Sequence, residues 1–78
     1  MAFRHSNLPL ATVRKVLENQ GCKFIGINAG HEKWTRSDLR RPIVIQTHID
    51  PVPEFIVRQI MRTLILDRKK MEQILKEI

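Results

Sequence analysis

The 78-residue sequence predicts an α+β fold, in which one helix, three antiparallel strands and two further helices follow one another. Apolar residues recur at helical spacing near both ends of the chain. The middle is rich in β-branched residues, and Gly, Pro, Asn and Asp stand where the pattern changes. A chain of this length forms one domain, residues 1–78, whose small core leaves no room for a large cofactor cleft.

The segment "NLPLATVRKVLENQG" predicts the first helix. One face of it would be apolar, formed by Leu10, Val13, Val16 and Leu17. Asn7 or a neighbour can cap its start, and Pro9 suits the first turn. Gly21 follows the last helical residue, where a left-handed backbone conformation is favoured.

Three strands are expected next. "CKFIGIN" predicts a strand over about residues 22–27, with Cys22 as a small core residue, and "NAG" forms the turn that follows it. "HEKWTR" continues as the second strand, "SDLRR" turns the chain, and "PIVIQTH" forms the third. The three together predict one antiparallel sheet.

Two helices complete the chain. Asp50 is the expected cap of the first of them and Pro51 its expected start. Its apolar positions lie one turn apart and comprise Ile56, Val57, Ile60, Met61 and Leu64. A short last helix follows from Asp67, with an apolar stripe of Met71, Ile74, Leu75 and Ile78. We expect all the helices to cover the same face of the sheet.

The second and third strands can be placed in register by their alternation. With a turn centred between Leu39 and Arg40, His31 is opposite His48 and Trp34 is opposite Ile45, unless a bulge changes the pairing. Trp34 then shares the core face with the isoleucines of the third strand. The exposed face would hold His31, Lys33, Thr35, Val44, Gln46 and His48.

Two histidines beside a lysine suit the cleavage of RNA. Histidine exchanges protons near neutral pH, so a pair of them can act as general base and general acid. RNA supplies its own nucleophile in the 2′-hydroxyl, and a cation such as Lys33 or Arg36 would stabilise the charge on phosphorus. Two strand histidines are also commonly plain surface residues. A metal site with Asp50 or Glu32 as third ligand is a further alternative, although the spacing matches no metal motif.

The composition limits the classes of molecule that the chain is expected to bind. Lys and Arg number 14 against 8 Asp and Glu, giving a formal charge of +6, which favours a nucleic acid or an acidic protein. The chain has four aromatic residues, too few for a platform of stacked bases, and Trp34 is expected in the core. Cys22 is the single cysteine, so no disulfide framework is expected. There is no apolar leader or membrane-length run, and we expect a cytoplasmic protein.

The stretches "LENQGCKF", "NAGHEKW", "PIVIQTHID" and "PVPEFIVRQIMR" together resemble the HicA toxins, the small mRNA interferases of bacterial HicAB toxin–antitoxin modules. The resemblance covers residues 8–75. It implies a double-stranded-RNA-binding-domain-like fold and metal-independent cleavage of mRNA without a cofactor, which arrests translation. The essential histidine of the family corresponds to His31, and the histidine that ends its third strand corresponds to His48.

The resemblance also implies a partner, a HicB-type antitoxin that covers the active site in a hetero-oligomer, while the toxin alone is expected to be monomeric. Two positions depart from the family pattern. Ala29 stands where the turn before the histidine usually has glycine, and Ile65 stands where many members have a glycine after the second helix. Each of these positions favours a residue that tolerates a positive φ.

The leading interpretation is therefore an endoribonuclease toxin. His31 would be the general base or acid, with His48 as its counterpart or as a residue that orients it. The candidate RNA-binding residues are Lys23, Gly30, Lys33 and Arg36. A non-catalytic RNA-binding module is the alternative, in which Arg58 and Arg62 would contact phosphates. A DNA-binding helix-turn-helix over residues 53–75 ranks last, because it leaves the strands unexplained.

Overall fold

The computed structural model describes residues 7–78, which form an α+β fold of helix, three-stranded antiparallel sheet and two helices. This confirms the predicted order of elements. The sheet has the strand order β1-β2-β3, so β2 is central. The elements are α1 (Leu10–Asn19), β1 (Lys23–Asn28), β2 (His31–Thr35), β3 (Ile43–Gln46), α2 (Glu54–Thr63) and α3 (Arg68–Glu77).

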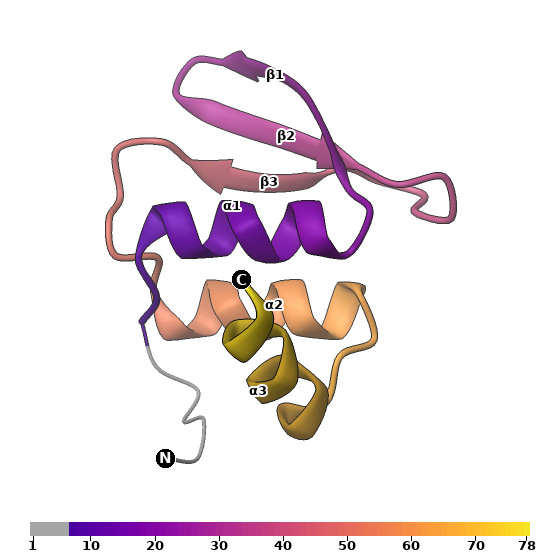
Figure 1. The fold of residues 1–78 in the computed structure, drawn as a ribbon. Coiled ribbons are helices and arrows are strands. Elements are labelled where there is room, and N and C mark those ends of the chain that lie inside the picture. The colour runs from indigo at the N-terminus through magenta and orange to yellow at the C-terminus, as the bar shows by residue number, and fades with distance from the viewer. Residues whose placement is uncertain (1–6) are drawn as a thin grey trace.

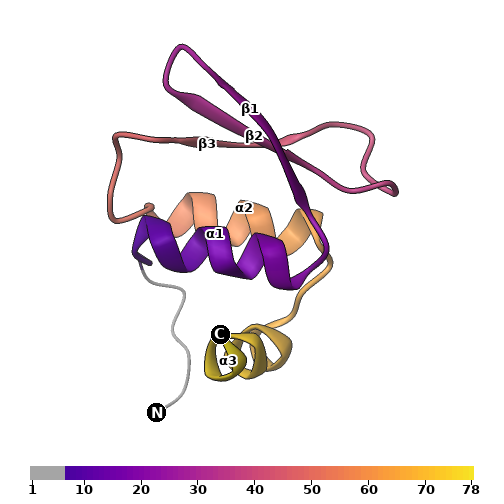
Figure 2. The same ribbon diagram turned by 45° about the horizontal axis from the view of Figure 1, so that its top comes forward.

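The sheet lies on one side of α1 and α2, and α3 lies on their other side (Figures 1 and 2). The helices therefore cover one face of the sheet, as expected, and leave the other face open. The core includes the predicted apolar face of α1, Trp34 and the isoleucines of β3. It continues through α2 into α3 with Val57, Ile60, Met61, Leu64, Met71 and Ile74. Cys22 is buried at its edge, as predicted.

The β1–β2 hairpin turns tightly at Ala29 and Gly30, between the paired residues Asn28 and His31. Their φ angles are 52° and 77°, and positive φ at both central positions is typical of a type I′ turn. Ala29 thus takes a left-handed conformation that favours glycine. A bulge interrupts β1 between Phe24 and Gly26.

The predicted pairing of β2 with β3 is wrong by two residues. His31 is opposite Gln46 rather than His48, and Trp34 is opposite Ile43 rather than Ile45. The observed pairing is centred between Asp38 and Leu39, one residue earlier than expected, and the connection contains a turn in which the Leu39 N–H donates to the Arg36 carbonyl (2.9 Å). A shift of two residues preserves the alternation of side chains, so the predicted division into core and exposed faces is confirmed.

The predictions of which residue caps α1 and which caps α2 are wrong. The Asp50 carboxylate, expected to cap α2, instead accepts the N–H of Leu10 at the start of α1 (3.0 Å). The Asn7 side chain, expected to cap α1, accepts the N–H of Glu54 at the start of α2 (3.0 Å). The two helices therefore exchange caps.

This exchange follows from the contact between the two segments that precede the helices. Leu8 and Val52 form an isolated antiparallel bridge through two backbone hydrogen bonds (3.2 and 2.7 Å). The bridge sets each polar side chain beside the other helix. Val52 lies in the bridge and Pro53 is extended, so α2 starts at Glu54 rather than at Pro51. α3 follows Asp67, as predicted, and it is capped locally because the Asp67 side chain accepts the Lys70 N–H (2.7 Å).

The ends of α1 and α2 have the same backbone form. At each end, the N–H groups of two successive residues donate to carbonyls three and five residues earlier, which is the Schellman pattern. The left-handed position is Gly21 after α1 (φ 80°), as predicted, and Ile65 after α2 (φ 56°). α2 thus ends as a glycine-terminated helix would. Within residues 7–78, no helix combines the length and the apolar character that crossing a membrane requires.

Candidate functional site

The open face of the sheet carries His31 and Lys33, which alternate along β2 with buried residues. Both are exposed. Across β3, His31 is opposite Gln46 and Lys33 is opposite Val44, and these two residues are exposed as well. The strand alternation therefore places an imidazole and an ammonium group on the same accessible face.

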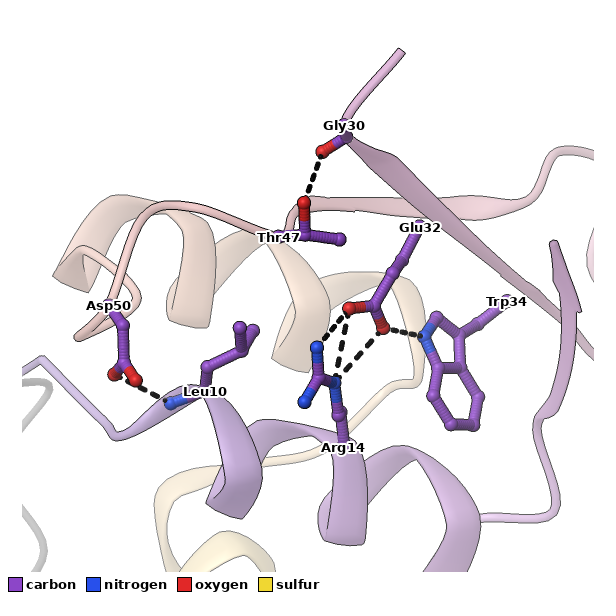
Figure 3. A network of polar contacts seen from close by, with 7 residues as sticks. All are labelled: Leu10, Arg14, Gly30, Glu32, Trp34, Thr47 and Asp50. Atoms are coloured by element: carbon purple, nitrogen blue, oxygen red, sulfur yellow. Dashed lines mark hydrogen bonds and ion pairs between the residues drawn. The ribbon is translucent and has the colours of Figure 1, made fainter. Parts of the chain in front are cut away.

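His48 lies in the turn that leaves β3, and it reaches the same end of the sheet. The Thr47 N–H and hydroxyl both donate to the Gly30 carbonyl, at 2.9 and 3.2 Å (Figure 3). This contact continues the β2–β3 pairing past the strand end. It joins the residue before His48 to the residue before His31, and so brings both histidines to one corner of the sheet.

The His48 ring lies directly against Gly30. A Cβ atom on Gly30 would come within 2.4 Å of His48 Cε1 and 3.0 Å of Nδ1, which is closer than atoms can approach. Gly30 also has a φ of 77°, which favours glycine. Glycine is therefore required here twice, for the turn and for the position of the imidazole. We treat Gly30, His31, Lys33 and His48 as the candidate site.

An ion pair between buried Glu32 and half-exposed Arg14 lies beneath this site, and the sequence did not predict it. Glu32, between His31 and Lys33, is 1% exposed, and its carboxylate accepts hydrogen bonds from the Arg14 guanidinium and from Trp34 Nε1 (3.1 Å; Figure 3). The sequence feature that could have indicated it is a carboxylate at an inward-facing strand position, two residues before Trp34. Its partner, Arg14, lies on the flank of an apolar helix face, 18 residues earlier in the chain.

The hydrogen bond from Arg14 lowers the pKa of Glu32 below its ordinary value, and the same hydrogen bond raises the pKa of Arg14. Glu32 is therefore an ionised, fully engaged group rather than a general base. It ties the middle of β2 to α1 and so supports the strand that presents His31 and Lys33.

A hollow of about 130 Å³ opens beside His31. It lies between β3, the loop that follows, and the first turn of α2. Its walls are mainly apolar, and Phe55, 68% exposed, stands at its rim on α2. The lining residues are His31, Val44, Ile45, Gln46, Ile49, Val52, Pro53, Phe55 and Ile56.

Lys23 and Arg36 lie at the other end of the β1–β2 hairpin, away from the histidines. Lys23 is opposite Thr35, four residues along β2 from His31, or about 13 Å at the usual rise of a strand. Arg36 donates to the Asp38 carboxylate (2.6 and 3.0 Å) and to the Gln20 carbonyl (2.9 Å). Of the six predicted site residues, four gather at one corner and these two do not.

Within residues 7–78, no three His, Cys, Asp or Glu side chains lie close enough to hold a metal ion. The carboxylates of Asp50 and Glu32, considered as third ligands, accept hydrogen bonds from Leu10 and from Arg14 and Trp34. Trp34 is buried in the core, as predicted, and is not a stacking surface for bases. The remaining histidine, His5, is outside the described residues.

No family model, no curated protein and no solved structure matches this chain. Its function is therefore inferred from the geometry of the candidate site and from the motifs that coincide with it.

Proposed function

We propose that this chain is a metal-independent endoribonuclease, an mRNA interferase toxin of the HicA type. One observation carries the proposal: the His48 imidazole lies against Gly30, the residue that precedes His31, at an accessible corner of the sheet. Two proton-transfer groups with Lys33 on the same face supply what RNA cleavage needs from a protein.

In the proposed reaction, one histidine removes the proton of a ribose 2′-hydroxyl, and that oxygen attacks the adjacent phosphorus. The bond to the 5′-oxygen of the next nucleotide breaks, and the other histidine protonates this leaving oxygen. The products are a 2′,3′-cyclic phosphate and a 5′-hydroxyl. His31 is the base or the acid, His48 is its counterpart, and Lys33 stabilises the charge that develops on the phosphoryl oxygens. Lys23 contacts a backbone phosphate farther along the hairpin, and Arg36 does so by exchanging its exposed ion pair with Asp38 for a phosphate.

The motifs shared with HicA toxins fall on this corner of the molecule. "NAGHEKW" forms the tight turn and all of β2 except Thr35, and "PIVIQTHID" forms β3 and the turn that carries His48. The α-β-β-β-α order agrees with a double-stranded-RNA-binding-domain-like fold, to which α3 is an addition. The proposed partner is a HicB-type antitoxin that covers the open face, and the proposed location is the cytoplasm. Without the antitoxin, the toxin is proposed to be monomeric.

The test is to express the wild-type chain, His31→Ala and His48→Ala in bacteria without antitoxin. Growth and the 5′ ends of mRNA are followed, and circular dichroism confirms that each variant folds. The control is Lys15→Ala, at an exposed position of α1. We expect growth arrest and new mRNA ends with the wild type and the control, and neither with His31→Ala. The purified wild type should cleave RNA equally well in EDTA. Cleavage that persists in folded His31→Ala would contradict the proposal.

The alternative is an RNA-binding module without catalysis. Such a module would place free cations on its second helix. Here Arg58 of α2 is paired with Glu54 on the same helix (3.0 Å), which leaves Arg62 as the remaining cation of α2 and favours the enzyme over the module. RNA binding that is unchanged in His31→Ala, with no cleavage by any variant, would support the module instead.

A further inference from the structure

We propose that the hollow beside His31 holds one unpaired nucleobase stacked on Phe55, so that the substrate is RNA that is single-stranded at the cleavage point. The inference rests on the proposed function, because it deepens the same site. It assigns a binding role to residues of the β3–α2 connection and of α2 that the cleavage chemistry does not use.

The position of the hollow suits a group attached to the scissile phosphate. His31 and Gln46 are cross-strand partners, and both line it. Phe55 and Ile56 contribute its opposite wall from the first turn of α2. A nucleotide whose phosphate contacts His31 could therefore place its base in the hollow without spanning any other part of the protein.

Its size and lining suit one planar ring system. The volume of about 130 Å³ is well below the roughly 300–1,000 Å³ of sites that enclose a whole drug-sized ligand. None of the nine lining residues is acidic, so nothing there repels a polyanion. The apolar walls accept the faces of a base, and the Gln46 amide offers both a donor and an acceptor to a base edge.

Phe55 is the strongest single sign of a ligand. Phe55 is 68% exposed at the rim of the hollow, and it is not part of the hydrophobic core. The other exposed phenylalanine of the described residues, Phe24, packs against Trp34 at a centroid distance of 5.5 Å. An accessible aromatic ring beside a proposed RNA-cleaving site is the arrangement by which proteins stack unpaired bases.

A base in a duplex cannot reach the hollow, because it is stacked between its neighbours and paired. The base has to be turned out of the helix, which costs least in RNA that is already single-stranded. The hollow thus predicts a preference for unpaired RNA. Lys33, on the same open face as His31, is available to the flanking phosphate.

The experiment measures binding, separately from cleavage. Three fluorescent 2′-O-methyl probes of eight nucleotides, which lack the 2′-hydroxyl nucleophile, are compared by anisotropy: a single strand, its duplex and an abasic strand. We expect the single strand to bind most tightly. Phe55→Ala should weaken binding of the single strand roughly tenfold or more, as loss of a stacked base does, and leave the abasic strand unaffected. Phe55→Tyr should retain binding, and Ile65→Ala, at another exposed apolar residue, should bind like the wild type.

Equal binding of the single strand by the wild type and Phe55→Ala would overturn the inference. So would equal binding of duplex and single strand, or an equal loss on the abasic probe. An effect of Phe55→Ala on antitoxin binding alone would assign the hollow to a protein side chain instead. Failure of the proposed function is distinguished by the His31→Ala cleavage assay, whose outcome does not depend on these probes.

Discussion

The two faces of β2 differ although they belong to the same five residues. On the inner face, Glu32 and Trp34 are buried, and the Glu32 carboxylate accepts hydrogen bonds from Trp34 Nε1 and from the Arg14 guanidinium. On the outer face, His31 and Lys33 are exposed, and their side chains form no hydrogen bond or ion pair with the described residues. The inner face therefore serves stability, and the outer face leaves its groups available for chemistry. Substitutions one residue apart should separate stability from cleavage.

The largest loss of stability is expected on the inner face. Arg14→Ala leaves the buried Glu32 carboxylate without its cation, and because Arg14 itself is half-exposed we expect the lower end of the cost of breaking a buried pair, about 3 kcal/mol of the free energy of unfolding. Arg58→Ala breaks an exposed ion pair and should cost about 1 kcal/mol or less. Urea denaturation followed by circular dichroism measures both. Equal stability of the two variants would show that the Arg14–Glu32 pair contributes no more to the free energy of unfolding than the surface pair Arg58–Glu54.

Gly30→Ala should affect both stability and cleavage, because Gly30 forms the hairpin turn and also lies against the His48 ring. The positive φ costs about 1–3 kcal/mol for a residue with a side chain, and the new Cβ displaces the His48 ring. Gly26→Ala is the matched control, since its φ is 142° but its Cβ would meet nothing within 4 Å. Both variants should be less stable, and only Gly30→Ala should lose cleavage of RNA. Normal cleavage by Gly30→Ala would remove His48 from the site.

The inner face should also make stability depend on pH. The pKa of Glu32 is lower in the folded chain than its ordinary value of 4.5, so the unfolded state binds the proton more tightly. The stabilisation from Glu32 is present above about pH 4.5 and is lost as the pH falls through the lower folded pKa. Urea denaturation between pH 2 and pH 6 should show this loss in the wild type and a smaller one in Glu32→Gln. Identical pH profiles would contradict the ionised state of Glu32.

A change far from β2 should raise stability without touching the outer face. Ile65 is 88% exposed and has a positive φ at the end of α2, where α1 has Gly21. Ile65→Gly removes the cost of a β-branched residue in this conformation and should stabilise the chain by about 1 kcal/mol. Thermal unfolding and the cleavage rate are measured together. A less stable variant would mean that the Ile65 side chain contributes packing that outweighs the backbone cost.

The smallest effect on stability is expected on the outer face itself. His31→Ala removes an exposed side chain without a hydrogen-bond partner, so its free energy of unfolding should stay within about 0.5 kcal/mol of the wild type. Cleavage should nevertheless be lost. A large loss of stability would show that His31 has a structural role, and the separation of the two faces would fail.

Much of the fold could be predicted because its signals are local. Helical spacing of apolar residues predicted the buried faces of α1, α2 and α3, and alternation predicted which residues of β2 and β3 face the core. Gly21 and Asp67 were identified because a helix end depends on residues within one turn of it. Part of the candidate site could be predicted for the same reason, since alternation alone places His31 and Lys33 on one exposed face.

Tertiary structure decided what local signals cannot specify. The cap of α1 comes from Asp50, 40 residues away, and the cap of α2 comes from Asn7, 47 residues away. The β2–β3 register was misplaced by two residues, because alternation of side chains is unchanged by such a shift. The partner of Glu32 and the hollow beside His31 likewise exist only once α1 and α2 have packed against the sheet. The amino-acid pattern determined which side chains of α1, β2, β3 and α2 are buried, whereas the apolar residues of β1 remain exposed. Packing of distant segments determined which side chains meet.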